Sequence, residues 1–172
     1  MQTKKRIILG SASPRRRELL EQIGISFEVR VSDKEEVYHS LIPEEIVKEL
    51  ALSKAENVAD DLREKQEQVK QISFDKKNNV LLDTIVIGAD TIVVSDGSIL
   101  GKPKDEADAV RMIRSLQGRS HKVYTGVAIL DYDDEGKRKS VVHAVETEVF
   151  VNPMSDEEIR EYAATGEPLD KA

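Results

Sequence analysis

Residues 6–24 read RIILGSASPRRRELLEQIG, a short apolar run followed by a helical pattern. The run Arg6–Gly10 is typical of a buried strand. Ser13 and Pro14 then suit the N-cap and the first position of a helix, and Gly24 suits its end. The apolar face of this helix is expected from three residues: Leu19, Leu20 and Ile23. The stretch therefore predicts a strand, a loop and a helix in succession.

Strands and helices are expected to alternate along the rest of the chain. The patterns predict strands at 26–31, 84–94, 121–132 and 140–151, and helices at 43–62, 105–118 and 155–166. The run 84–94 is interrupted by Gly88-Ala89-Asp90, and residues 65–79 are polar enough to indicate a surface excursion. This alternation predicts an α/β fold, a mixed twisted sheet with flanking helices, in one domain over residues 1–172.

Composition narrows the function classes. The net charge of −7 argues against a protein that coats nucleic acid. The chain has no cysteine, which excludes disulfides and zinc–thiolate sites and suits a reducing compartment. The apolar run Ile7–Leu9 near the N-terminus is too short for a signal peptide or a membrane span. These features predict a cytoplasmic protein that does not bind membranes.

The first candidate site is the loop Ser11–Arg16 between the first strand and the first helix. A helix N-terminus presents unpaired N–H groups and a partial positive charge, so it can bind an anion. Two serine hydroxyls and the guanidinium groups of Arg15 and Arg16 would add what a polyphosphate requires. The alternative is an ordinary strand-to-helix turn with a solvated arginine face.

The second candidate is Asp90, within Gly88-Ala89-Asp90-Thr91. A charged aspartate in a run of valine and isoleucine is costly unless it is paired, binds a metal or lies at a strand end. Such a carboxylate could activate water or hold Mg²⁺. The alternative is a turn aspartate between two short strands.

The third candidate is Gly101-Lys102-Pro103-Lys104, where a proline restrains two lysines that could contact phosphate. Surface lysine loops are common, so taken alone this loop indicates little. The sequence contains neither a Walker loop nor a G-x-G-x-x-G fingerprint, which disfavours P-loop and Rossmann chemistry. The three histidines lack metal-site spacing and are interpreted as incidental: His39, His121 and His143.

Together these segments resemble the Maf family of nucleoside triphosphate pyrophosphatases. Gly118-Arg119-Ser120-His121 and Gly166–Ala172 resemble two further signature segments of that family, in the same order. The resemblance implies a two-lobed fold of the Maf and inosine triphosphatase type, with the active site in a central cleft. It also implies hydrolysis of the α–β phosphate bond, a divalent cation (Mg²⁺ or Mn²⁺) and a homodimer. The family continues past Ala172 into a glycine-rich stretch, so we expect this chain to lack the family's C-terminal segment.

The resemblance also assigns roles to single residues. Asp90 matches the family's proposed proton acceptor, and Glu36 matches a cleft carboxylate. Both could bind the metal, and the sequence does not divide the roles of base and metal ligand between them. Thr91 matches the branch that acts on dTTP and UTP, so a pyrimidine triphosphate is the expected substrate. The remaining matches are to substrate-binding positions: Ser11, Arg15, Arg16, Lys102 and Lys171.

Two other classes of protein share these features. A non-catalytic nucleotide-binding regulator of cell division, as the older family name of septum formation inhibitor suggests, would bind the same ligand without turnover. A nucleotidyltransferase would transfer the nucleotide to an acceptor. Release of pyrophosphate from nucleotide and water alone separates the three classes.

Overall fold

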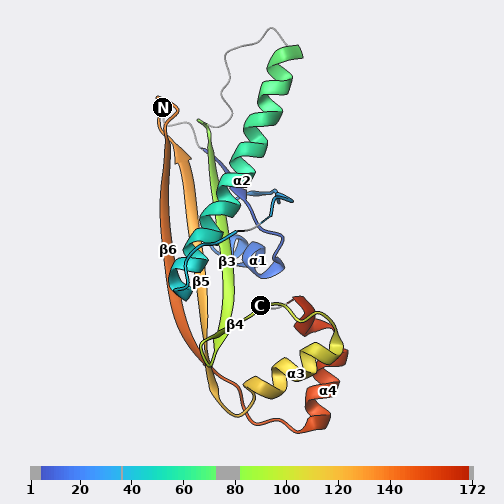
Figure 1. The fold of residues 1–172 in the computed structure, drawn as a ribbon. Helices are drawn as coiled ribbons and strands as arrows, with labels where there is room; N and C mark the ends of the chain where they lie inside the picture. The colour runs from blue at the N-terminus through green and yellow to red at the C-terminus, as the bar shows by residue number, and fades with distance from the viewer. Residues whose placement is uncertain (1–4, 36, 73–81, 171–172) are drawn as a thin grey trace. The chain divides into compact units, whose positions relative to one another are not determined.

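The computed structural model describes residues 5–35, 37–72 and 82–170 (Figure 1). Its strands are β1 (Arg6–Leu9), β2 (Glu28–Val29), β3 (Thr84–Ser95), β4 (Ser98–Leu100), β5 (Ser120–Tyr132) and β6 (Arg138–Phe150). Its helices are α1 (Pro14–Gln22), α2 (Pro43–Ile72), α3 (Glu106–Leu116) and α4 (Asp156–Ala164), followed by a 3₁₀ turn, η1 (Glu167–Asp170).

The six strands of the described residues form one mixed sheet in the order β2-β1-β3-β5-β6, with β4 paired to β3. β1 runs parallel to both β2 and β3, whereas β4 is antiparallel to β3. The predicted α/β class with a mixed sheet is therefore confirmed. The sequence analysis did not predict β4. The Asp96-Gly97 pair is a sequence signal for a two-residue hairpin turn, and in the structure the two residues have the positive φ angles of such a turn, 50° and 75°.

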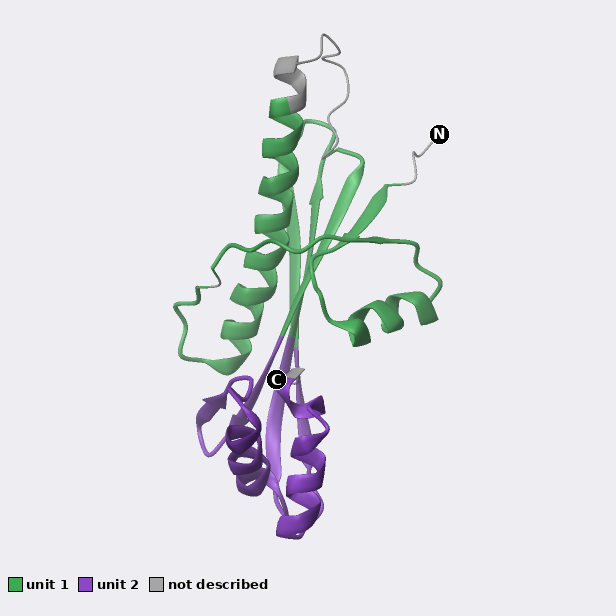
Figure 2. Cartoon of the chain, turned by 90° about the vertical axis from the view of Figure 1, so that its right-hand side faces the viewer, with its two compact units in different colours: residues 1–90, 126–144 green, residues 91–125, 145–172 purple. Residues whose placement is uncertain are grey.

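The chain divides into two compact units (Figure 2). Unit 1 comprises residues 1–90 and 126–144, and unit 2 comprises residues 91–125 and 145–172. Because β3, β5 and β6 are 12 or 13 residues long, each of them contributes one part to each unit.

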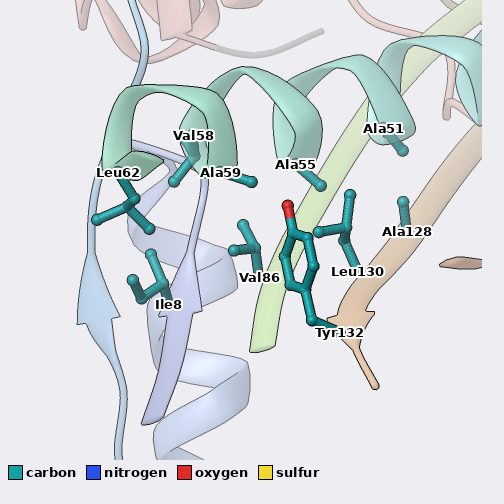
Figure 3. Close-up of a cluster of buried hydrophobic side chains, with 10 residues drawn as sticks. All are labelled: Ile8, Ala51, Ala55, Val58, Ala59, Leu62, Val86, Ala128, Leu130 and Tyr132. Atoms are coloured by element: carbon teal, nitrogen blue, oxygen red, sulfur yellow. The ribbon is translucent and has the colours of Figure 1, made fainter. Parts of the chain in front are cut away.

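The core of unit 1 lies between α2 and the sheet (Figure 3). Small residues of α2, among them Ala51, Ala55 and Ala59, face the strands and are fully buried. Opposite them lie larger side chains from three different strands: Ile8, Val86, Leu130 and Tyr132. Pairing a helix face of small residues with a sheet face of large ones allows the helix to approach closely.

Two glycines mark the closest approach of α2 to the sheet. A Cβ atom at Gly88 of β3 would lie 2.1 Å from the carbonyl oxygen of Ala51 and 2.8 Å from the backbone nitrogen of Ala55. At Gly126 of β5 it would lie 2.1 Å from the carbonyl oxygen of Val47. The helix backbone thus rests directly on two strands, at positions where only glycine fits.

Unit 2 is organised by two capped helices that pack on each other, α3 and α4. The Asp105 side chain accepts a hydrogen bond from the N–H of Asp108 at the start of α3. A capping box is present at the start of α4, between Ser155 and Glu158. Such caps satisfy N–H groups that a helix leaves unpaired at its first turn.

Two elements are longer than the sequence predicted: α2 and β3. Residues 65–72, expected in a polar excursion, instead continue α2, while residues 73–79 lie outside the described residues. β3 is not interrupted at Gly88-Ala89-Asp90, because glycine and alanine there allow close packing without ending the strand. No helix of the described residues is long and apolar enough to cross a membrane.

Helix α1 and its surroundings also differ from the expectation. No residue of α1 is buried, and Leu19 and Ile23, expected on an inward apolar face, are 60% and 68% exposed. The Ser13 side chain makes no capping hydrogen bond. The strand expected at 26–31 is limited to Glu28–Val29.

We predict that Gly88→Ala lowers the free energy of unfolding by about 3 kcal/mol, a typical cost of overpacking. The added methyl group would collide with the backbone of α2 rather than with a movable side chain. Urea denaturation followed by circular dichroism measures the change. Gly101→Ala is the matched control, because a Cβ at Gly101 meets no atom of the described residues within 4 Å. Equal stability of the two variants would contradict the close contact.

Candidate functional site

The loop between β1 and α1 is fastened to β3 at its start. The N–H of Gly10 donates to the carbonyl oxygen of Ile87 at 2.7 Å, which continues the parallel pairing of β1 with β3. Ser11 follows and is only 5% exposed, one of the few buried polar side chains of unit 1 among the described residues. A buried hydroxyl requires hydrogen-bond partners, and the structure supplies them.

Arg16 links Ser11 to β3. Its Nη1 donates to Ser11 Oγ at 2.8 Å and to the carbonyl oxygen of Ala89 at 2.9 Å. The N–H of Ser13 donates to Ser11 Oγ as well, at 3.3 Å. Because Ser11 Oγ accepts two hydrogen bonds, its own O–H proton remains to be donated. A hydroxyl in this state matches an oxygen that can only accept, such as that of a phosphate.

The neighbouring arginines of α1 have different surroundings. Arg17 donates from Nη2 to the carbonyl oxygen of Ala12 at 2.9 Å, and this hydrogen bond is exposed to solvent. Arg15 is exposed, and its guanidinium has no partner among the described residues. Because Ser13 does not cap α1, the first-turn N–H of Arg15 is also unpaired within that part of the chain. An exposed guanidinium and an N–H group without a partner in the described part of the chain are therefore both present at a helix N-terminus, an arrangement that suits an anion.

Asp90 lies two residues beyond Gly88 on β3, so its side chain points to the same face of the strand, toward α2. Lys54 of α2 donates from Nζ to Asp90 Oδ1, and the side chains are 20% and 13% exposed, respectively. Oδ2 of Asp90 has no hydrogen-bond partner among the described residues. The carboxylate is thus oriented through one oxygen and has the other available.

Lys54 is a residue that the sequence analysis missed. It lies between Ala51 and Ala55 on the helix face that packs against β3. A lysine among small residues on an inward helix face is rarely buried without a partner, and that signal could have identified it. Its partner could not be inferred, because the pairing depends on the contact of α2 with Gly88.

Thr91 directly follows Asp90, but consecutive side chains of a strand point to opposite faces. Thr91 Oγ1 lies 3.1 Å from Oγ1 of Thr125 on β5, and either hydroxyl can be the donor. Both residues belong to unit 2 and both are half-buried. The structure therefore ties Thr91 to β5.

Lys102 is exposed and follows β4 in unit 2. The loop that carries it is anchored at its far end, where the N–H of Lys104 donates to Asp108 Oδ2 of α3 at 3.1 Å. This hydrogen bond and the cap at Asp105 join the lysine loop to a helix N-terminus. The loop that carries Lys102 is therefore ordered at one end by hydrogen bonds to the start of α3.

Arg119, in the segment Gly118–His121, contacts the turn between β3 and β4 within unit 2. Arg119 Nη2 donates to Asp96 Oδ1 and, at 3.3 Å, to Ser95 Oγ. This guanidinium lowers the pKa of Asp96. Burial, followed by the charge of Arg119, lowers the pKa of His121, and among the described residues His121 Nδ1 is buried without a hydrogen-bond partner. The imidazole is therefore neutral near pH 7, although neither its sequence context nor these contacts assign it a reaction.

Two predicted site residues, Glu36 and Lys171, lie outside the described residues. Within the described residues, no group of three or more histidine, aspartate or glutamate side chains is arranged to hold a metal ion. Mg²⁺, however, is often held by one or two carboxylates together with substrate phosphates. Asp90, with one oxygen available, fits that kind of site.

The comparisons with known proteins agree with the resemblance. dTTP/UTP pyrophosphatase of Geotalea uraniireducens is 46% identical over 173 residues, which cover 100% of this chain and 78% of that protein. dTTP/UTP pyrophosphatase of Agathobacter rectalis is 43% identical over 166 residues, 96% of this chain and 78% of that protein. Among solved structures, a HAM1 protein from Coxiella burnetii has a TM-score of 0.48 at 15% identity, over 84% of this chain and 71% of that one.

The family model described as Maf-like protein matches residues 6–172, nearly the whole chain. This match and relatives above 40% identity lead to one conclusion. The chain belongs to the Maf family.

Proposed function

We propose that this chain hydrolyses the α–β phosphate bond of dTTP- and UTP-like nucleotides to a nucleoside monophosphate and pyrophosphate. The observation that carries the proposal is a connection within unit 1. Arg16 joins the anion-binding loop at Ser11 to the carbonyl of Ala89, and the next residue is Asp90, the carboxylate held by Lys54. An anion site and a proton acceptor are thus fixed to one another through a single peptide unit.

Charge neutralisation is the first requirement of the reaction. A triphosphate is a polyanion, and an anionic base cannot deliver water to phosphorus until that charge is reduced. Arg15 and the first-turn N–H groups of α1 would bind phosphate oxygens, and Ser11 would donate its remaining proton to one of them. Arg16 would contribute the positive charge of its guanidinium. A divalent cation bound to the phosphates would supply further neutralisation, with Glu36 as a protein ligand. The available oxygen of Asp90 would either bind that cation or accept the proton of water, and the second role is the one used in the proposed step.

Proton transfer follows from the state of Asp90. In the proposed step, a water oxygen forms a bond to the α-phosphorus while the bond from that phosphorus to the bridging oxygen breaks. Asp90 Oδ2 accepts the proton of the water, since Oδ1 is engaged by Lys54. The electron pair of the broken bond leaves with pyrophosphate.

We further propose that Lys102 and Lys171 contact phosphate and that Thr91 takes part in selecting the base. The names of the relatives support a pyrimidine triphosphate as substrate. A homodimer, a single domain and a cytoplasmic location remain predictions of the sequence. Gel filtration with light scattering measures the first of them.

The direct test is release of pyrophosphate from nucleotide and water with no acceptor present. The panel comprises dTTP, UTP, CTP, ATP, GTP and 7-methyl-GTP, each with Mg²⁺ or Mn²⁺. In water labelled with oxygen-18, attack at the α-phosphorus places the label in the monophosphate, whereas attack at the β-phosphorus places it in pyrophosphate. We expect a preference for dTTP and UTP, with the label in the monophosphate.

Other results assign the chain to another class. Nucleotide binding by calorimetry without any pyrophosphate would indicate a binding regulator. Pyrophosphate that forms only when an acceptor is added would indicate a nucleotidyltransferase. A preference for purine nucleotides would remove the pyrimidine assignment.

We predict that Asp90→Asn lowers kcat by roughly 10²- to 10⁴-fold, the contribution typical of one general base. Nucleotide binding should persist, because the groups assigned to phosphate binding are unchanged. The substitution removes the negative charge that the half-buried ammonium of Lys54 contacts at Asp90, so unfolding is measured in parallel. Adding Lys54→Gln should recover stability but not turnover. Near-normal turnover in Asp90→Asn would refute the role.

We predict that the three arginines respond differently to alanine. Arg15→Ala should raise KM and lower kcat without changing stability, since its guanidinium has no partner among the described residues. Arg16→Ala should impair both activity and stability, because the Ala89 carbonyl and Ser11 Oγ lose the hydrogen bonds that Arg16 donates. Arg17→Ala is the matched control and should have little effect. A damaging Arg17→Ala with a silent Arg15→Ala would contradict the assignment.

A further inference from the structure

Thr125 is a residue to which neither the sequence motifs nor the proposed mechanism assigns a role. Its hydroxyl lies 3.1 Å from that of Thr91, and the two hydroxyls join neighbouring strands of unit 2. We infer that Thr125 is a positioning residue that fixes the side chain of Thr91 and so contributes to nucleotide selectivity. This inference rests on the proposed function, in which Thr91 takes part in base selection.

The surroundings of Thr125 hold it in place. Tyr124, the preceding residue, is buried, and its hydroxyl donates to Glu146 of β6. Glu146 also pairs with Lys122 of β5 at 2.8 Å. The backbone of β5 is thus tied to β6 immediately before Thr125, on the face of the strand opposite to its hydroxyl. These contacts on β5 help to hold Thr125 in position next to the side chain of Thr91.

A second set of contacts joins β3 to the start of β5. Arg119, the residue before β5, donates to Ser95 and Asp96 at the end of β3. With the hydroxyl pair, the two segments are linked at two points within unit 2. Thr91 lies within the regular part of β3, so the direction of its hydroxyl is set by its χ1 rotamer.

The rotamer of a threonine decides which chemistry it presents. Rotation about χ1 exchanges the positions of its hydroxyl and its methyl group, and β-branched side chains occupy few rotamers. The hydrogen bond to Thr125 favours the rotamer in which the Thr91 hydroxyl faces β5. Without it, a methyl group could take that place, which would change what a nucleobase meets at Thr91.

The test compares kcat/KM for UTP with kcat/KM for GTP in five variants. Thr125→Val removes the hydroxyl at nearly constant shape, whereas Thr125→Ser retains it. Thr91→Val and the double variant Thr91→Val/Thr125→Val measure the coupling of the pair. Thr147→Val makes the same chemical change at an exposed position of β6 and serves as the control.

We predict that Thr125→Val lowers the UTP/GTP selectivity ratio roughly 3- to 10-fold, the effect of losing one hydrogen bond. Thr125→Ser and Thr147→Val should retain the wild-type ratio. The double variant should be no less selective than Thr91→Val, because Thr125 acts through Thr91.

Three results would overturn the inference. They are an unchanged ratio in Thr125→Val, an unchanged ratio in Thr91→Val, and an equal loss of activity toward every nucleotide that tracks a loss of thermal stability. Failure of the proposed function itself is separate, since wild-type protein would then release no pyrophosphate from any nucleotide.

Discussion

The contact of the α2 backbone with Gly88 of β3 is the constraint on which the arrangement of unit 1 depends. At that point a Cβ atom would lie 2.1 Å from a backbone oxygen of the helix, so helix and strand meet without intervening side chains. Two consequences follow. The alanines of α2 reach the large apolar residues of the strands, and Lys54 is brought within hydrogen-bond distance of Asp90. One packing requirement therefore serves both the core and the candidate site.

The order of elements could be predicted from the sequence because hydrophobic periodicity and capping residues are local properties. The capping box at Ser155 and the cap at Asp105 are examples, since each depends on residues three positions apart. The end of α2 could not be predicted in the same way. Its last ten residues, 63–72, are polar or charged except for Val69 and Ile72, and two apolar residues are too few to distinguish a helix that extends beyond its packed region from a surface loop. The exposure of Leu19 and Ile23 likewise depends on what covers α1, which sequence spacing does not reveal.

In the candidate site, too, local features could be predicted from the sequence and tertiary contacts could not. A strand, a serine-rich loop and a helix with three arginines predicted an anion site, and the loop at Ser11 does carry a hydroxyl with a proton to donate. The different surroundings of Arg15 and Arg16 could not be read from the sequence, because only the fold brings the Ala89 carbonyl to Arg16. Asp90 was identified as a costly charge in an apolar strand, and such a charge requires a partner. The identity of that partner, Lys54, follows from tertiary packing alone.

The pairing of Asp90 with Lys54 also resolves an electrostatic difficulty in an acidic protein that is proposed to bind a polyanion. Two unit charges 4 Å apart near a protein surface interact by about 4 kcal/mol, so an isolated carboxylate would repel an approaching phosphate. Lys54 offsets the charge of Asp90 through a direct hydrogen bond. The net charge of −7 is then of little consequence at the site, because salt screens exposed charges beyond about 8–10 Å. Local pairing of charges, rather than the net charge of the protein, therefore determines whether an anion can approach this site.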